Sequence, residues 1–251
     1  MLSPIDLTVR QESSLLGRTN PVVKLAVALV WLVGLALIRD PVRPLVLALA
    51  AIVAGLVLGR IPRAKLIAGL APLVAAAGSI ALANLVFAAA NTDPFAHEIA
   101  RVGPLRLTAE AIVGASAIGA RVVAIVATGV VFAQTTDPTR LVDALVQHAR
   151  VPERFAYGAL AAYRAVPQLG QDLGTLRQAR RIRGVAGTWH PKLLVGLLVR
   201  AIRHADQLAL AMDARAFGVG PRTTYRPVGR HWRDVIVAFG GAAIIVALVV
   251  G

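Results

Sequence analysis

The side chains of this chain that suit binding chemistry are mostly arginines, and they gather in two basic clusters. Each cluster is followed by a glycine: the members are Arg177, Arg180, Arg181 and Arg183 before Gly184, and Asp213 and Arg215 before Gly218. Because glycine commonly follows a helix C-terminus, each cluster predicts a helix end. A guanidinium group carries five donors in a rigid planar fork that matches carboxylates and phosphates. Each cluster is therefore either a binding site for such anions or ordinary solvated charge.

Motifs of the common catalytic classes are absent from the sequence. A P-loop needs a lysine between glycine and serine or threonine, but the three lysines follow Val23, Ala64 and Pro191. The five histidines include no pair four residues apart, which excludes a zincin-type metal site, and no Gly-x-Ser-x-Gly elbow occurs. The lack of cysteine excludes thiolate catalysis and Cys-ligated metals. We therefore expect a protein that is not an enzyme and that itself binds no metal and no cofactor.

Composition places these arginines on a membrane protein. Hydrophobic residues make up 57% of the chain and charged residues only 16%, and the mean hydropathy is +0.69. A soluble domain averages about 45–50% apolar and about 25% charged residues. The 27 Lys and Arg outnumber the 13 Asp and Glu, and in membrane proteins such an excess is typical of the cytoplasmic side. We expect contact with the lipid bilayer and none with nucleic acid.

Five apolar stretches are predicted to be transmembrane helices, because roughly 20 apolar residues of helix cross a bilayer. They are residues 22–38, 45–58, 66–90, 111–133 and 235–250. The predicted fold class is an all-α, polytopic membrane protein with about five transmembrane helices and a polar region of long amphipathic helices. The predicted domains are an N-terminal bundle of four spans (1–134), the polar region (135–230) and a C-terminal span (231–251).

The basic residues also orient the spans. With a cytoplasmic N-terminus, most of the 27 Lys and Arg lie on the cytoplasmic side, as the positive-inside rule requires. The arginines of the connecting segments that fall outside are Arg39, Arg43, Arg101 and Arg106. We therefore expect the N-terminus and the polar region inside and the C-terminus outside.

The polar region 135–230 begins with a helix-start signal and continues with two long amphipathic helices. Asp137 is expected to be the N-cap, and Pro138 the first residue, of a helix that ends near Arg150. Apolar residues then repeat every 3.5 positions in two seams, from Phe155 to Leu176 and from Leu194 to Met212. Because charged residues interrupt both seams, these helices should pack against each other or lie along the membrane face rather than cross it.

Two cations at or inside the spans each allow two interpretations. Lys24, in Asn20-Pro21-Val22-Val23-Lys24, either snorkels to the interface from a helix started by Pro21 or belongs to a special motif. Arg121 lies inside the fourth span, where a charge at the bilayer centre costs roughly 2.5–3.5 kcal/mol on insertion scales. Its small neighbours favour a position that faces protein. For Arg121, a hydrogen bond to a carbonyl and a functional role are equally compatible with the sequence.

The segments around the two basic clusters resemble the transmembrane T component of energy-coupling factor transporters, a family that includes the membrane subunit of cobalt and biotin uptake systems. The family carries two X-Arg-X motifs at the ends of two long cytoplasmic coupling helices. Ile182-Arg183-Gly184 and Ala214-Arg215-Ala216 match them, with Ile182 and Ala216 in place of the commoner small residue and glycine. Three supporting segments also match, namely Asn20-Pro21-x-x-Lys24-Leu25, Thr136-Asp137-Pro138 and Arg222-Thr223-x-Tyr225-Arg226.

The resemblance implies a non-catalytic subunit of an importer. Its implied partners are two ABC-type ATPase subunits, which hold ATP and Mg, and a separate substrate-binding S component in the membrane. Arg183 and Arg215 would each bind an acid-rimmed groove of one ATPase, and the long helices would transmit ATPase motion to the S component. The substrate would be a vitamin or a transition-metal ion. The chain would be a multi-pass protein of the bacterial cell membrane with a cytoplasmic N-terminus.

Two other functions are compatible with the residues alone: a conventional ABC permease that binds substrate itself, and a polytopic membrane enzyme acting on phosphorylated lipid. Few polar groups lie in the spans to form a substrate cavity, namely Ser79, Asn84, Ser116, Arg121 and Thr128. No constellation of carboxylates or histidines favours the enzyme. Co-purification separates the three, because a T component needs ATPases and a small membrane partner, a permease needs only ATPases, and the enzyme needs neither.

Overall fold

The computed structural model describes residues 14–38, 40–92, 96–102, 105–184, 190–220, 224 and 226–250. Contacts within the chain divide it into two compact units. We call residues 1–141 together with 228–251 the membrane unit, and residues 142–227 the hairpin unit.

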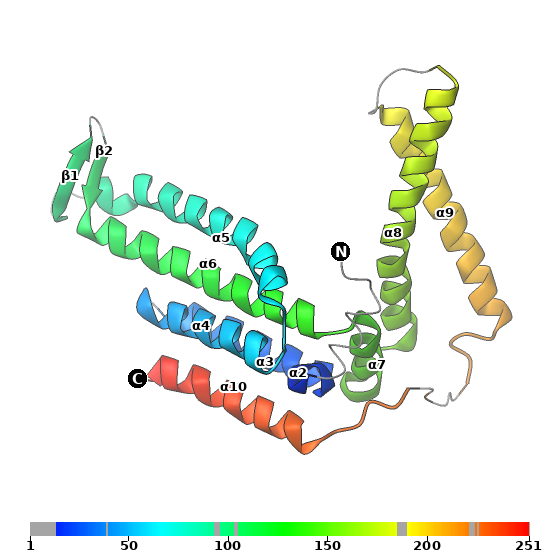
Figure 1. The fold of residues 1–251 in the computed structure, drawn as a ribbon, viewed down its shortest axis with the longest axis horizontal. Helices are drawn as coiled ribbons and strands as arrows, with labels where there is room; N and C mark the ends of the chain where they lie inside the picture. Colours follow the sequence, from blue (N-terminus) through cyan, green and yellow to red (C-terminus); the bar gives the residue numbers. More distant parts are fainter. Residues whose placement is uncertain are drawn as a thin grey trace. The chain divides into compact units, whose positions relative to one another are not determined.

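Apolar helices build the membrane unit (Figure 1). They are α3 (Pro21–Leu37), α4 (Val42–Val57), α5 (Arg63–Val86), α6 (Ala109–Thr135) and α10 (Trp232–Val250). By length and composition α5, α6 and α10 are able to cross a membrane, whereas α3 and α4 are shorter apolar helices. Each of the five predicted stretches thus lies largely in a helix, and the all-α membrane-protein fold class is confirmed.

The membrane unit also contains short elements that apolar periodicity does not predict. They are the helix α2 (Leu15–Arg18), the 3-10 helix η1 (Ala89–Thr92) and a hairpin of β1 (Glu98–Val102) and β2 (Leu105–Thr108). Arg106 pairs with Glu98 across the hairpin at 3.0 Å. At its end Thr108 accepts a bond from the Ala111 N–H, which caps α6, and donates its hydroxyl to Asn91 Oδ1 at 3.1 Å. The hairpin is thereby fixed to the first turn of α6.

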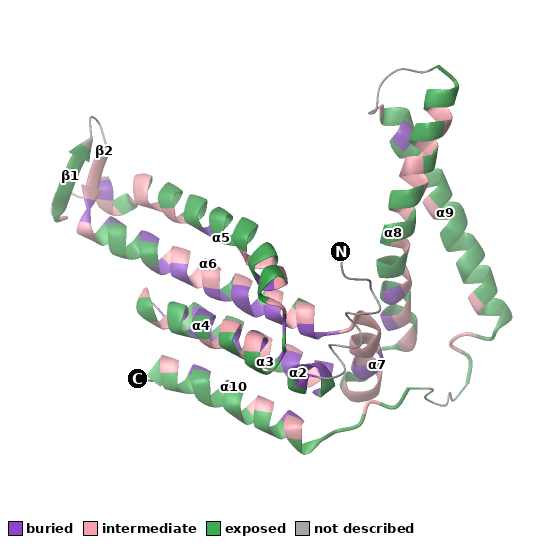
Figure 2. Ribbon diagram, viewed as in Figure 1, coloured by how far each residue is buried: buried purple, intermediate pink, exposed green. Residues whose placement is uncertain are grey.

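Helix α6 forms the centre of the membrane unit, because it packs against both α4 and α5. Its buried face consists mainly of alanines, namely Ala111, Ala115, Ala117, Ala120, Ala124 and Ala127. Small side chains let helices approach closely where the lipid supplies no hydrophobic driving force. In Figure 2 buried residues recur along α6, while the outer faces of its neighbours are exposed.

The apolar helices α3 and α10 are joined by a reciprocal glycine contact. Gly34 of α3 faces the Ile245 side chain of α10, and Gly241 of α10 faces the Val27 side chain of α3. A Cβ at either glycine would overlap the facing side chain. The indole N–H of Trp31 donates to the Gly241 carbonyl at 2.8 Å. This close approach explains how a helix more than 200 residues later in the chain completes the bundle.

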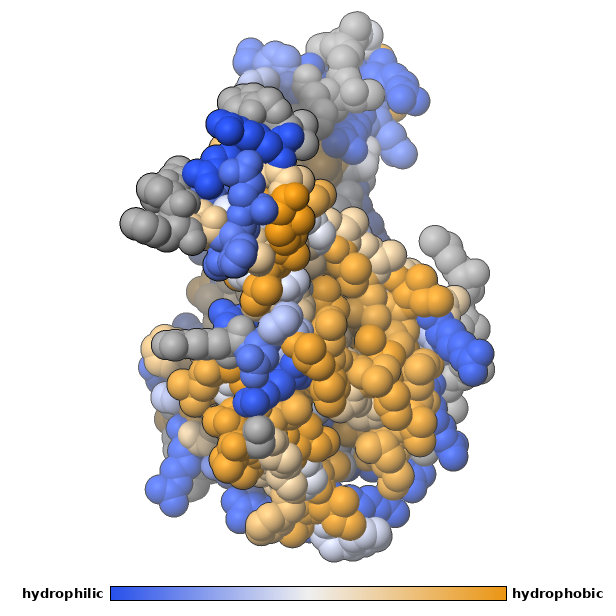
Figure 3. Space-filling view, turned by 90° about the vertical axis from the view of Figure 1, so that its left-hand side faces the viewer, coloured by the Kyte–Doolittle hydropathy of each residue, from blue (hydrophilic) through white to orange (hydrophobic). Residues whose placement is uncertain are grey.

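Large apolar side chains cover the outside of the membrane unit. Examples with more than half of their surface exposed are Val33, Leu37, Leu49, Leu82, Ile236 and Phe239. Figure 3 shows hydrophobic side chains spread over much of the face in view. Because soluble monomers rarely expose apolar patches above a few hundred Å², this surface is that of a protein embedded in a membrane.

The hairpin unit is built on two long helices, α8 (Glu153–Ile182) and α9 (Pro191–Ala214), which follow α7 (Pro138–Ala149). Asp172 of α8 pairs with Arg200 of α9 at 3.0 Å, and Leu176 of α8 lies beside Gly196 of α9. These contacts make the two helices antiparallel. Of the two predicted arrangements, the one in which they pack against each other is observed, although many apolar seam residues stay exposed, among them Phe155, Val166, Leu194 and Leu198.

Candidate functional site: two arginines at helix ends

Arg183 occupies the C-cap of α8. Its backbone is close to helical (φ −77°, ψ 6°), and its N–H donates to the Ala179 carbonyl at 3.3 Å. The next residue, Gly184, has φ +71° and donates its N–H to the Arg181 carbonyl at 3.1 Å. A left-handed residue at this position is the common way to end a helix, and glycine adopts it without steric cost. Ile182, Arg183 and Gly184 are all exposed.

Arg215 occupies the same position at the end of α9. Ala216 follows it with φ +54°, so an alanine stands where glycine is commoner. The Phe217 N–H donates to the Met212 carbonyl at 3.0 Å, and the Ala216 N–H donates to the Asp213 carbonyl at 2.9 Å. These two bonds are the pair that defines a Schellman cap. The departure at Ala216 therefore keeps the cap geometry, at a steric cost of roughly 1–2 kcal/mol for a left-handed alanine.

The two X-Arg-X motifs thus share one geometry, in which the arginine is the C-cap and the third residue is left-handed. They lie at opposite ends of the antiparallel helix pair. Since α8 has 30 residues and an α-helix rises about 1.5 Å per residue, the ends of α8 are separated by about 45 Å. The structure does not bring Arg183 and Arg215 into a single site. It presents two equivalent exposed guanidinium-bearing ends.

The supporting residues Asn20, Pro21 and Lys24 form a joint at the start of α3. The Asn20 side chain accepts the Val22 N–H at 3.0 Å, and Pro21 is the first helical residue. Lys24 is only 6% exposed, and its ammonium group donates to the Thr135 carbonyl at 2.7 Å. Lys24 therefore does not snorkel to solvent. It binds the last carbonyl of α6, where a cation also complements the helix dipole.

Asp137 and Pro138 begin α7, as the sequence predicts. The Asp137 carboxylate accepts the Thr139 N–H at 3.1 Å, and the Asp137 carbonyl accepts the Leu141 N–H at 2.9 Å. Because only Thr136 separates Thr135 from Asp137, the bond from Lys24 fixes the junction between α6 and α7. Of the remaining matched segment, Arg222, Thr223 and Tyr225 lie outside the described residues.

Asp234 completes this joint and was not among the predicted site residues. Its carboxylate accepts the Asn20 N–H at 2.7 Å and the His231 N–H at 2.9 Å, and the residue is 5% exposed. Asp234 thus fixes the start of α10 to the start of α3. The available signal was its isolation, because it is the single acidic residue between residue 231 and the end of the chain.

Arg121 forms a hydrogen bond that joins α6 to α3. Its guanidinium donates to the carbonyl of Ile38, the C-cap of α3. Arg121 Nε is buried and has no partner among the described residues. Of the two interpretations of Arg121, the structure supports the hydrogen bond to a carbonyl.

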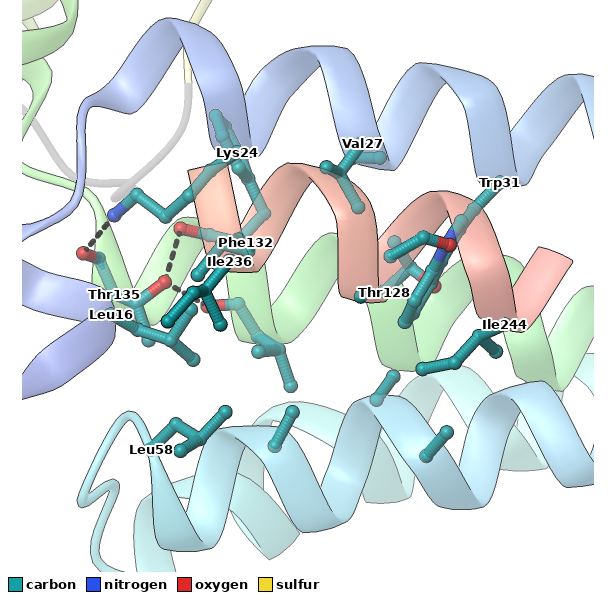
Figure 4. A pocket seen from close by; sticks show the side chains of 18 residues that line it. Leu16, Lys24, Val27, Trp31, Leu58, Thr128, Phe132, Thr135, Ile236 and Ile244 are labelled. Carbon is teal, nitrogen blue, oxygen red and sulfur yellow. Dashed lines mark hydrogen bonds between the residues drawn. The ribbon is translucent and has the colours of Figure 1, made fainter. Parts of the chain in front are cut away.

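A cavity of about 270 Å³ lies between α3, α4, α6 and α10 in the membrane unit (Figure 4). Its polar lining residues are Lys24, Thr128 and Thr135. Each polar head already has a partner: Lys24 binds the Thr135 carbonyl, and the two hydroxyls donate to Ala124 and Val131 at 2.9 and 2.8 Å. The cavity therefore offers an apolar wall rather than a polar substrate site. Within the described ranges, no three His, Asp or Glu side chains are placed to hold a metal ion.

Comparisons with known proteins identify the family. The family model for CbiQ, described as a cobalt transport protein, matches residues 12–225. The energy-coupling factor transporter transmembrane protein EcfT of Limosilactobacillus fermentum is 29% identical over 237 residues, which cover 88% of this chain and 86% of the relative. EcfT of Heliobacterium modesticaldum is 28% identical over 265 residues, 97% of each chain.

A third relative has a different name and a greater length. A putative ABC transporter ATP-binding protein of Bifidobacterium longum is 25% identical over 253 residues, which cover 92% of this chain but only 31% of that protein. The CbiQ match includes both arginine motifs, the joint at Lys24 and the start of α7. The chain therefore belongs to the CbiQ family, the EcfT/CbiQ-type transmembrane components of energy-coupling factor transporters.

Proposed function

We propose that this chain transmits the ATP-driven motion of two ATPase subunits to a substrate-binding membrane subunit, within an importer of the energy-coupling factor type. The observation that carries the proposal is the pair of arginine C-caps, each followed by a left-handed residue and placed at opposite ends of one helix pair. A single cluster would suit one partner. Two separated, equivalent ends suit two copies of one partner.

Each arginine is suited to dock in an acidic groove. Arg183 and Arg215 are exposed at their helix ends, and the left-handed residue after each turns the chain away from the axis of the helix. A guanidinium in that place is able to form bidentate, charge-assisted bonds to carboxylates. With about 45 Å between the ends of α8, the two arginines would bind separate ATPases, and movement of the ATPases would shift α8 along α9.

The Bifidobacterium relative supports an ATPase partner. Its name describes an ATP-binding protein, and the segment similar to this chain makes up 31% of it. More than two thirds of that polypeptide is thus available for other functions, nucleotide binding among them. By analogy, ATP and Mg would bind to ATPase subunits that are separate polypeptides and assemble with this chain.

The apolar cavity favours a separate substrate-binding subunit over a permease that binds substrate itself. Its lining is mostly apolar, and the heads of its Lys and Thr residues each donate to a backbone carbonyl, so it is poorly matched to a polar vitamin or a hydrated metal ion. We infer that an S component binds the vitamin or transition-metal ion and contacts this chain within the membrane.

The test of this function compares the two motif arginines with two exposed arginines on the same helices, Arg177 of α8 and Arg203 of α9. The chain is co-expressed with its ATPases, and their co-purification is measured together with substrate uptake at equal membrane levels. Truncating one partner of a buried charge pair costs roughly 2–5 kcal/mol. Arg183→Ala and Arg215→Ala should each reduce uptake strongly, and the double variant should release the ATPases.

The controls Arg177→Ala and Arg203→Ala should retain both ATPases. Arg→Lys at either motif should restore function only in part, since a point charge does not reproduce a bidentate fork. Equal losses in the motif and control pairs would show that the arginines act as generic positive charge.

The proposed orientation is tested separately by topology reporters. Fusions after residues 63, 150 and 188 should report the cytoplasm, and a fusion after residue 100 should report the outside. An external signal at residue 188 would place the arginine ends on the wrong side of the membrane for an ATPase.

A further inference from the structure

The two arginine motifs have the same cap but different surroundings. Within the described residues, Ile182, Arg183 and Gly184 form hydrogen bonds only to the last turn of α8. The second motif continues into contacts with another helix. The Phe217 ring meets the Tyr157 ring edge-on, with centroids 6.2 Å apart and planes at 79°, and the Gly218 carbonyl accepts a bond from Arg154 at 3.4 Å.

The segment after α9 is shaped to make this contact. Three of its five residues from 216 to 220 are left-handed: Ala216, Gly218 and Gly220 have φ of 54°, 79° and 77°. The Val219 N–H donates to the Ala216 carbonyl at 3.2 Å, which closes the turn. Phe217 lies between two left-handed residues and is half-buried. The turn thus sets Phe217 against the first turns of α8.

Tyr157 is in turn fixed to α7. Its hydroxyl donates to the Asp143 carboxylate at 2.9 Å, and Asp143 is 7% exposed. A buried carboxylate needs such donors, because an unsatisfied buried charge is costly. Tyr157 therefore makes two contacts at once: its hydroxyl binds α7, and its ring edge supports the turn after Arg215.

We propose that Tyr157 is a positioning residue for the second arginine motif, holding the turn at Phe217 so that Arg215 is fixed before an ATPase binds, whereas the described residues around Arg183 offer it no corresponding ring contact. The inference rests on the proposed function of the arginines, which it deepens by making the two docking ends unequal. The second end is preorganised, and preorganisation raises affinity by lowering the ordering cost of binding.

The structural half of the proposal is tested without any ATPase. The chain contains no cysteine, so a single cysteine introduced at Ala214 or at Ile182, both exposed, carries a spin label at one motif only. Label mobility is measured in the full chain reconstituted in lipid nanodiscs. Tyr157→Leu should increase mobility at position 214 and leave position 182 unchanged, and Tyr157→Phe should give a smaller increase at 214.

Two matched variants control this measurement. Tyr163→Phe changes an exposed tyrosine of the same helix and should leave both labels unchanged. Asp143→Asn keeps an oxygen acceptor for the Tyr157 hydroxyl and should stay near the parent. Unchanged mobility at 214 in Tyr157→Leu, or equal increases at 182 and 214, would overturn the positioning role.

The functional half measures ATPase affinity with one docking end removed. In the Arg183→Ala background only the second end remains, and Tyr157→Leu should weaken ATPase binding about tenfold, which corresponds to ~1.4 kcal/mol. In the Arg215→Ala background the same change should have little effect.

The two proposals fail in different ways. If adding Arg215→Ala to the Arg183→Ala background does not weaken ATPase binding, the proposed docking function is wrong. If Arg215→Ala weakens binding but Tyr157→Leu does not, docking stands and the positioning role of Tyr157 is wrong.

Discussion

The basic side chains at helix ends are placed differently in the two units of this protein. In the membrane unit, four of them donate to carbonyls at the ends of other helices: Lys24 to Thr135 of α6, Arg121 to Ile38 of α3, Arg43 to Leu248 of α10 and Arg140 to Gly17 of α2. In the hairpin unit, Arg183 and Arg215 stand exposed at the ends of their own helices. Cations at these positions thus join helices within the membrane unit, whereas the two motif arginines of the hairpin unit face outward.

The physical environment accounts for the difference. The last four carbonyls of a helix have no partner within the helix. Where such an end is shielded from water, a cation from a neighbouring helix supplies the donor and complements the negative end of the helix dipole. At the ends of α8 and α9, backbone N–H groups of the following turn bind carbonyls of the last turn, and the side chains of Arg183 and Arg215 lie exposed. Part of the excess of Lys and Arg in this chain therefore forms hydrogen bonds that join helices.

The largest expected effect is the difference in stability between a variant of an internal cation, Lys24, and a variant of an exposed motif arginine, Arg183. Lys24→Met keeps the apolar stem of the side chain but removes the donor to the Thr135 carbonyl, and it should lower the free energy of unfolding by about 2 kcal/mol. Arg183→Ala removes an exposed side chain and should change it by less than about 0.5 kcal/mol. Thermal unfolding of both variants in detergent measures the contrast, and equal losses of stability would contradict it.

A second prediction compares the two caps themselves. Ala216→Gly removes the strain of a left-handed alanine and should raise the stability of the hairpin unit by about 1 kcal/mol. Gly184→Ala introduces the same strain and should lower it by a similar amount. Denaturant unfolding monitored by circular dichroism gives both values. Changes of the same sign would show that the two caps do not share their geometry.

A third prediction is that the loss of stability on replacing an internal cation increases with the burial of that cation. Arg43 is partly exposed, pairs with Asp40 at 2.9 Å and donates to the Leu248 carbonyl at 3.3 Å. Because solvent weakens such contacts, Arg43→Met should destabilise the protein by only about 0.5 kcal/mol, well below the effect at Lys24. A loss at Arg43 as large as that at Lys24 would mean that burial does not decide the strength of these bonds.

The smallest expected effect is on the alkaline titration of Tyr157. Burial first, and then the hydrogen bond to Asp143, raise the pKa of Tyr157 from 10.0 to about 12. The neutral phenol is thus favoured in the folded state, so its contribution to stability is complete below pH 10 and is lost as the pH rises through about 12. A spectrophotometric titration of tyrosinate should lose its most alkaline step in Tyr157→Phe. Loss of a step near the ordinary pKa instead would contradict the hydrogen bond to Asp143.

Features set by nearby residues were predictable from the sequence. The apolar stretches located the membrane helices, because burial in lipid requires length and hydrophobicity in one continuous segment. Asp137 and Pro138 marked the start of α7, and the glycine after Arg183 marked the end of α8, because caps are formed within a few residues. The hairpin β1–β2 was missed, since its strands are short and lack an apolar run, although Gly103-Pro104 between them is a turn signal.

The tertiary structure alone decided which partner each polar side chain would find. The Lys24 ammonium group donates to a carbonyl 111 residues away, and the Asp234 carboxylate accepts from the backbone N–H of Asn20, 214 residues away. Tyr157 gained its role only when the turn after α9 placed Phe217 beside it. Periodicity and capping are short-range effects that fix where helices begin, end and turn their apolar faces. The contacts between them depend on how whole helices pack, and no local pattern of residues contains that information.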